Sequence, residues 1–171
     1  DAHANRVVAK LENLAISYFR LNLDVDSLKN TLLTFDGFVW NIKTPNGNII
    51  SSDISCVWIR KYFVELSIQE KEQLDSSIDF KIWKNEFNAT LLGLYASLKP
   101  LPWLNPISNA IKGDNKYYQM DLASKIGFKM PKTIVSNDRA RLMQFAKSCD
   151  GDVIFKLLNQ EVYKADKNGA M

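Results

Sequence analysis

Apolar residues recur at helical spacing between residues 67 and 98, and this pattern constrains the fold more than any other in the chain. Successive apolar side chains there are separated by four, four, three and four residues: Trp83, Phe87, Leu91, Leu94 and Leu98. Such a stripe covers one face of a helix and has to be buried against another element. We therefore predict one long helix, or two broken ones, packed on a sheet.

Strands for that sheet are predicted on both sides of the helix. Residues 38–52 are expected to form a β-hairpin, because two strand-like runs flank the turn-forming segment TPNG. The segment DISCVWIRK is predicted to be another strand, which ends in charge at Arg60 and Lys61. KPLPWLNP is predicted to be a short proline-bounded strand or turn, and it is the best candidate for a boundary within the chain. Three tryptophans are expected to lie in the core: Trp58, Trp83 and Trp103.

The first residues predict a helix followed by a strand. Asp1 is placed to cap the helix DAHANRVVAKLENL, and ISYFRL, residues 16–21, is predicted to be the strand. Because a helix that leads into a parallel strand normally follows an earlier strand, we expect a short apolar strand before Asp1. His3 is the sole histidine, so a Ser/His/Asp triad or a multi-histidine metal site is not predicted. It is expected to be exposed, and its position at a βα turn leaves contact with a substrate open.

Beyond the proline-bounded segment, the pattern predicts alternating helices and extended segments. Residues 114–126 are expected to form a helix that Gly127 stops, and Pro131 keeps the following residues extended. Asn137 is expected to cap a second helix, which continues through about Ser148. The strand DVIFKLL and the first arm of a hairpin, EVYKADKNGAM, are predicted to come last.

Lys156 interrupts the apolar run GDVIFKLL, in which Val153, Ile154 and Phe155 are predicted to form a buried strand. An ammonium group is costly to bury without a partner. Two interpretations follow. Either Lys156 ends the strand in solvent with its stem buried, or it binds an anion.

Composition limits the class of protein. Of the 171 residues, 46% are hydrophobic, which is enough for at least one core. The net charge of +3 comes from scattered basic residues, which argues against a nucleic-acid-binding surface. Cys56 and Cys149 supply neither a disulfide framework nor a cluster of zinc ligands. With no signal-like segment and no apolar run long enough to span a bilayer, we expect a cytoplasmic protein without a membrane partner.

The second part of the chain resembles the start of an ATP-grasp domain. The run that carries the resemblance has a helix with an early lysine, a glycine, a proline-led strand, a capped helix and a strand lysine: NKYYQMDLASKIGFKMPKTIVSNDRARLMQFAKSCDGDVIFKLL. Upstream segments are similar to the pre-ATP-grasp domain and its junction in the microviridin-type, or grasp-with-spasm, ATP-grasp peptide ligases: DAHANRVVAKLENLAISYFRLNLD, SCVWIRK and WLNPISNAIKGDNKYYQMDLASKIG. The resemblance extends from Asp1 to about Leu158.

The resemblance implies an α/β fold in two parts. Residues 1–108 are expected to form a Rossmann-like pre-ATP-grasp domain whose first strand is missing from this sequence, and residues 109–171 the α+β beginning of an ATP-grasp small lobe. By position, Lys116 and Lys156 match the two lysines that contact nucleotide phosphates in ATP-grasp enzymes, although Lys116 alone would be interpreted as a surface residue. The cofactors implied are ATP and Mg²⁺, with the metal ligands expected beyond Met171.

The implied function is ATP-dependent ligation. A carboxylate of a ribosomally made precursor peptide is expected to be activated as an acyl phosphate and joined to a hydroxyl or an amine, which gives an ester or amide ring. The chain alone is expected to be incomplete and inactive, and no catalytic residue or metal ligand is assigned within it. Arg60 is either a charged strand end or a group that meets a substrate carboxylate or phosphate. A homodimer is an expectation of the resemblance alone.

Three alternatives stay open. One is another ATP-grasp carboxylate–amine ligase, which adds amino acids to a small molecule or to a protein terminus. The second is a non-catalytic α/β binding module, in which Lys156 is a surface residue. The third is one half of a split ligase whose other half is a separate chain.

Overall fold

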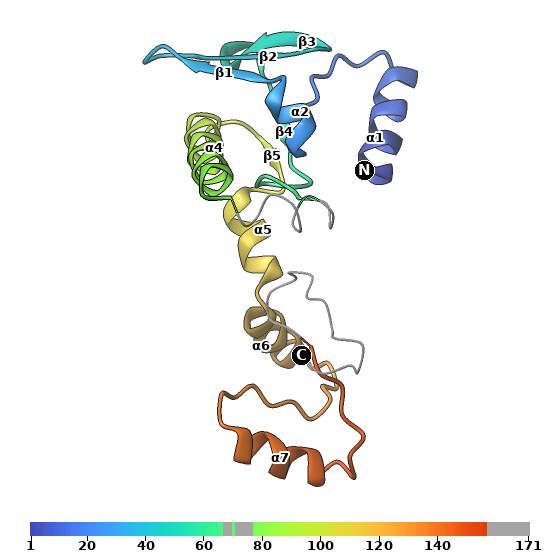
Figure 1. Cartoon of the computed structure of the whole chain (residues 1–171). Helices are drawn as coiled ribbons and strands as arrows, with labels where there is room; N and C mark the ends of the chain where they lie inside the picture. The colour runs from blue at the N-terminus through green and yellow to red at the C-terminus, as the bar shows by residue number, and fades with distance from the viewer. Residues whose placement is uncertain (67–69, 71–76, 157–171) are drawn as a thin grey trace. The chain divides into compact units, whose positions relative to one another are not determined.

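The computed structural model describes residues 1–66, 70 and 77–156 (Figure 1). The chain divides into two compact units, Asp1–Ser108 and Asn109–Met171. The described residues of the first unit include two small sheets and the helices α1 (Ala2–Asn13), α2 (Val25–Lys29) and α4 (Ile78–Ser97). Three helices lie further along the chain: α5 (Ile107–Asp114), α6 (Lys116–Lys125) and α7 (Arg139–Lys147). The mixed helix-and-sheet class predicted from the sequence is confirmed.

The larger sheet is antiparallel, with the order β1-β2-β3. Its strands are short: β1 (Leu32–Phe35), β2 (Trp40–Thr44) and β3 (Gly47–Ile50). The predicted hairpin is confirmed by β2 and β3, in which Thr44 pairs with Gly47 at the turn. Gly47 has a φ of 146°, a conformation that other residues rarely adopt. Strand β1 was not predicted, and its addition makes β2 the central strand.

The smaller sheet pairs β4 (Val57–Trp58) in parallel with β5 (Trp103–Leu104). Helix α4 lies between these strands in the sequence, so the three elements form a β-α-β unit. The predicted strand DISCVWIRK is confirmed only at its centre, and the proline-bounded segment is confirmed as β5. Trp103 packs against the core, but Trp58 is 40% exposed, so its assignment to the core was wrong.

Helix α4 confirms the stripe from which the fold was predicted. Leu91 and Leu94 are 0% and 2% exposed, and Leu98 is also buried. Trp83 and Phe87 are half-buried against the same core. Residues 67–69 and 71–76, where the predicted helix would begin, lie outside the described residues.

Contacts between α4 and the three-stranded sheet build part of the core (Figure 1). The buried Trp40 of β2 donates a hydrogen bond from Nε1 to Ser97 Oγ at 3.0 Å. Its ring lies over Gly93, where a Cβ atom would come within 3.4 Å of Trp40 Cζ2. A glycine in mid-helix thus permits a close approach of helix and sheet.

Two predicted strands are not strands in the described part of the chain. Residues 16–21 belong to no helix or strand there, and Phe19 and Leu21 pack on the core. The apolar character of these two residues is explained by packing on the core and not by strand pairing. Residues 152–156 are also outside any described strand, and three of them are exposed by 47%, 86% and 68%: Val153, Ile154 and Phe155. The buried strand predicted there was wrong for these residues, because a strand needs a neighbour to bond its N–H and C=O groups. Residues 157–171, with the predicted hairpin arm, lie outside the described residues.

Helix ends follow local hydrogen-bond chemistry. Asp1 caps α1 as predicted, and Gly127, with a φ of 81°, follows the end of α6 as predicted. The predicted cap of α7 was one residue too early, since Asp138 and not Asn137 occupies that position. Asp138 Oδ1 accepts hydrogen bonds from two N–H groups of the first turn, at 2.8 and 3.3 Å. The short helices α2 and α5 were not predicted.

Candidate functional site

Two parallel strands end side by side in the first unit. Val57 N donates to Pro102 O at 2.9 Å and Ile59 N donates to Leu104 O at 3.0 Å, so the chain leaves β4 beside the end of β5. Ligands of open α/β sheets bind outside the carboxyl ends of parallel strands. Arg60, the residue predicted to bind substrate, directly follows this ladder.

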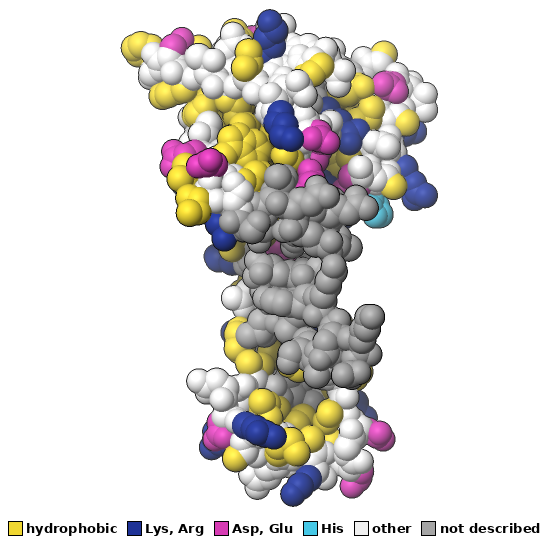
Figure 2. All heavy atoms as spheres, viewed as in Figure 1, with side chains coloured by type: hydrophobic (Ala, Val, Ile, Leu, Met, Phe, Trp, Pro, Cys, Tyr) yellow, Lys and Arg dark blue, Asp and Glu magenta, His cyan; other side chains and the backbone are white. Residues whose placement is uncertain are grey.

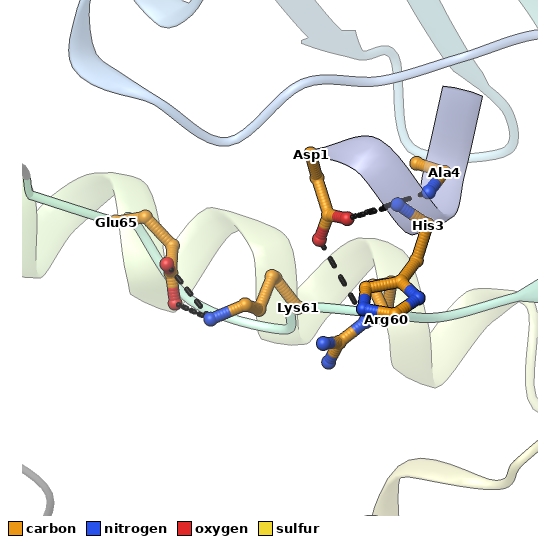
Figure 3. Close-up of polar contacts among 6 residues, drawn as sticks. All are labelled: Asp1, His3, Ala4, Arg60, Lys61 and Glu65. Carbon is orange, nitrogen blue, oxygen red and sulfur yellow. Dashed lines mark hydrogen bonds and ion pairs between the residues drawn. The ribbon is translucent and has the colours of Figure 1, made fainter. Parts of the chain in front are cut away.

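Asp1 and Arg60 meet at this edge, as Figure 3 shows. Asp1 Oδ1 accepts hydrogen bonds from His3 N at 2.8 Å and from Ala4 N at 3.4 Å. Asp1 Oδ2 lies 3.7 Å from Arg60 Nε. One carboxylate therefore caps α1 and also forms an ion pair with the guanidinium group.

The guanidinium of Arg60 keeps further capacity for an anion. Its side chain is half-exposed, and its two terminal nitrogens have no partner within residues 1–66, 70 and 77–156. A guanidinium binds a carboxylate or phosphate best through two parallel N–H bonds, which these nitrogens can supply.

The residues next to Arg60 are less available to bind an anion. Lys61 Nζ lies 2.9 Å from both carboxylate oxygens of Glu65, so its charge is already paired (Figure 3). His3 is exposed, as predicted. Of the two cations predicted to end this strand, Arg60 is the better placed to bind a ligand.

Sequence reasoning identified Asp1 as a cap and Arg60 as a strand end, but it missed their pairing. The two residues belong to elements far apart in the sequence, and only the fold brings them together. The one local indication was that capping uses a single carboxylate oxygen of Asp1 and leaves the second oxygen available for another partner.

Lys116 and Lys156 lie on separate elements of the second unit. Lys116 is the first residue of α6 and is half-buried, whereas Lys156 is exposed in the extended segment after α7. Figure 1 shows that segment turning back toward α6. Neither lysine forms an ion pair within the described residues, and no contact joins them there. A lysine at a helix N-terminus gains nothing from the helix dipole, which favours an anion at that position.

Metal ligands are not assembled in the described part of the chain. No three side chains of His, Cys, Asp or Glu among those residues lie close enough to hold a metal ion. These residues do not fit a Mg²⁺ site, and the ligands predicted beyond Met171 stay a prediction. Within the same residues, no helix combines the length and the apolar character needed to cross a membrane.

Comparison with known proteins gives one family match. The sequence profile of the MvdD pre-ATP grasp domain matches residues 1–111. Among curated proteins, none matches the chain.

The solved structures that resemble the chain include the following three. The macrocyclase MdnB from Microcystis aeruginosa MRC is 27% identical, with a TM-score of 0.69 over 86% of this chain and 48% of that one. The macrocyclase MdnC from the same source, bound with the precursor peptide MdnA, is 20% identical, with a TM-score of 0.71 over 94% and 52%. A RiPP-associated ATP-grasp ligase from Chryseobacterium gregarium, in complex with ADP and a leader and core peptide, is 28% identical, with a TM-score of 0.57 over 84% and 43%. The chain spans about half the length of each of these structures.

Proposed function

The chain belongs to the MvdD pre-ATP-grasp domain family, and from this premise we propose that it is the N-terminal portion of an ATP-dependent ligase that matures a ribosomally made precursor peptide. The match over residues 1–111 carries the proposal. It is supported by the 27% identity to a macrocyclase and the 28% identity to a RiPP-associated ATP-grasp ligase in complex with ADP.

The proposed reaction joins two side chains of one peptide. A carboxylate oxygen of the peptide attacks the γ-phosphorus of ATP, ADP leaves, and an acyl phosphate forms. A hydroxyl or amine of the same peptide then attacks the carbonyl carbon and loses its proton as phosphate leaves. The activation is needed because a free carboxylate is a poor electrophile and phosphate is a good leaving group. The product is an ester or amide ring.

Lys116 and Lys156 have the task of holding the nucleotide phosphates in this proposal. An ammonium group is a compact charge on a flexible stem, so lysines on two separate elements can both reach a polyphosphate. The absence of ion-pair partners for either lysine among the described residues supports this role.

Arg60 is proposed to bind a carboxylate of the peptide. Asp1 Oδ2 lies 3.7 Å from Arg60 Nε, and in this role the terminal nitrogens donate hydrogen bonds to the peptide carboxylate. This role requires Asp1, at the start of α1, and Arg60, just after β4, to stay in contact during turnover.

The test uses the full-length ligase with ATP and its precursor peptide. Lys156→Ala is expected to weaken ATP use by removing a charge-assisted contact worth about 1.5 to 3 kcal/mol. Lys147→Ala, in the last turn of α7, is the matched control and should leave ATP use unchanged. The measurements are ADP release and intact peptide mass, which falls by one water for each ring. Unchanged ADP release in Lys156→Ala would remove that lysine from the site, and ring formation without ADP release would contradict the function itself.

A further inference from the structure

Strand β1 is at the edge of its sheet and borders a groove. Among residues 1–66, 70 and 77–156, the order β1-β2-β3 gives β1 a single neighbouring strand. Between β1 and α4 lies an open groove of about 380 Å³. Residues 31–34 line one side, and the other side is one face of α4: Trp83, Glu86, Phe87 and Thr90. Every lining residue belongs to the first unit.

The outer edge of β1 offers backbone groups for another strand. Asp36 N donates to Val39 O at 3.4 Å just beyond the paired residues of β1 and β2. This bond shows which residues of β1 direct their backbone N–H and C=O groups toward β2. Because bonded and non-bonded pairs alternate in antiparallel sheets, Leu32 and Thr34 bond to β2. Leu33 and Phe35 therefore direct their N–H and C=O groups away from β2, toward the open edge. An extended segment could pair there.

Aromatic side chains form the apolar part of this surface. Trp83 and Phe87 are half-buried, with ring centroids 5.4 Å apart. Phe35 stacks on Trp40 at 4.9 Å and is still 50% exposed. Figure 2 shows hydrophobic side chains, in yellow, gathered below the sheet on the side of α4.

The turn after β1 extends the exposed apolar surface. Asp36 Oδ1 accepts hydrogen bonds from Phe38 N at 3.0 Å and from Val39 N at 2.9 Å, which fixes the turn. Phe38 is 92% exposed on it. The turn therefore adds an exposed aromatic side chain to the surface next to β1.

Charge on α4 is divided between two faces. Glu86 is exposed in the groove and has no ion-pair partner among the described residues. At about 100° per residue, Asp79 falls on the same side of the helix, whereas Lys81 and Lys84 fall on the other. The groove is therefore apolar with an acidic border, and a complementary ligand is apolar with a basic side chain.

We propose that the β1 edge and the groove beside α4 bind an extended, apolar segment of the precursor peptide that carries a basic side chain opposite Glu86. This inference rests on the proposed function, which supplies a peptide as the partner. The segment adds a strand to β1 through Leu33 and Phe35, and alternate side chains enter the groove against Trp83 and Phe87.

A second copy of the chain fits this surface less well. A symmetric pair of β1 edges would place the same residues of both copies against each other. Strand β1 contains no basic residue, and Asp36 directly follows it. Strand β1 itself then supplies no cation to pair with the acidic border of the other copy.

The test measures peptide binding to the full-length ligase without ATP, by fluorescence anisotropy. The probe is a labelled synthetic peptide of alternating valine and arginine. Two comparison peptides replace arginine by glutamate, or carry N-methyl groups that remove alternate hydrogen-bond donors. The arginine peptide is expected to bind, the glutamate peptide to bind more weakly, and N-methylation to weaken binding by at least about fivefold.

Glu86→Lys is expected to weaken binding of the arginine peptide about two- to fivefold, the range for an exposed ion pair. The matched control is Lys81→Glu, a charge reversal on the opposite face of α4, which should leave binding unchanged. Glu86→Lys should also strengthen binding of the glutamate peptide, an effect that a folding defect cannot produce.

Several outcomes would overturn the proposal. They are no binding of the arginine peptide, equal binding of its N-methylated form, or equal effects of the two α4 variants. A change of sedimentation in Glu86→Lys with peptide binding unaltered would assign the edge to a second copy instead. The binding measurement needs no ATP, so it remains valid even if the full-length protein does not catalyse the proposed ligation. If rings form but the peptide does not bind in the groove, this inference is wrong and the proposed function is unaffected.

Discussion

The helices of the two units are stabilised in different ways. Every buried apolar side chain among the described residues belongs to Asp1–Ser108, in two clusters around Leu91 and Leu94. In residues 109–156 the apolar side chains are half-buried or exposed, and the helices begin and end at local signals such as Asp138 and Gly127. Long-range packing therefore selects the structure of the first unit, while local hydrogen bonds mark out the elements of the second.

The largest expected effect is the loss of a core side chain. Leu91→Ala should lower the free energy of unfolding of the first unit by about 2 to 5 kcal/mol, because Leu91 is 0% exposed and its removal leaves a cavity. The matched substitution in the second unit is Leu122→Ala, at a side chain 46% exposed in α6, which should change stability by less than about 0.5 kcal/mol.

Urea unfolding followed by tryptophan fluorescence reports on the first unit, which contains all 4 tryptophans. Amide hydrogen exchange in α6 reports on the second. If the two leucine substitutions lower stability by the same amount, both units depend on buried packing, and the proposed difference between the units is wrong.

The elements predicted correctly were those with signals in their own residues. The α4 stripe, the TPNG hairpin, the Asp1 cap and the Gly127 stop each follow from side-chain spacing or backbone geometry at one place in the chain. The apolar run before Lys156 looked equally clear, but a strand also requires a neighbour, and the run itself cannot specify one. The same ambiguity affected residues 16–21, of which Phe19 and Leu21 pack on the core without any strand pairing.

The candidate site was predictable only in part. A position after a strand made Arg60 a candidate for anion binding, but its orientation by Asp1 depends on how α1 and β4 pack. The edge of β1 was missed because the run LLTF is short and was assigned to no element. Family resemblance placed Lys116 and Lys156, and their convergence on one nucleotide stays a prediction.

A smaller effect is expected at the start of α7, where the predicted cap, Asn137, was wrong. Asp138→Ala should lower the local stability of α7 by about 1 kcal/mol, because Asp138 Oδ1 accepts two hydrogen bonds from the first turn. Asn137→Ala is the matched control and should have little effect, since Asn137 is not the cap. The measurement is amide exchange at Ala140 and Arg141. If the two variants lose protection equally, local capping does not determine this end of the second unit.

The smallest expected effect tests whether local hydrogen bonds also act independently within the packed unit. The N–H groups of Val39 and Phe38 lower the pKa of Asp36 below its ordinary value of 3.8, since they favour the charged carboxylate. A lowered folded-state pKa contributes stability that is present above pH 3.8 and lost as pH falls through the folded value. The amide resonances of Phe38 and Val39 should therefore shift on acidification, and Asp36→Asn should abolish the transition because its amide does not titrate. The indole N–H of Trp40, bonded to Ser97 in the core, should not follow that transition. If it does, the turn and the core open together, and packing controls even the local contacts of the first unit.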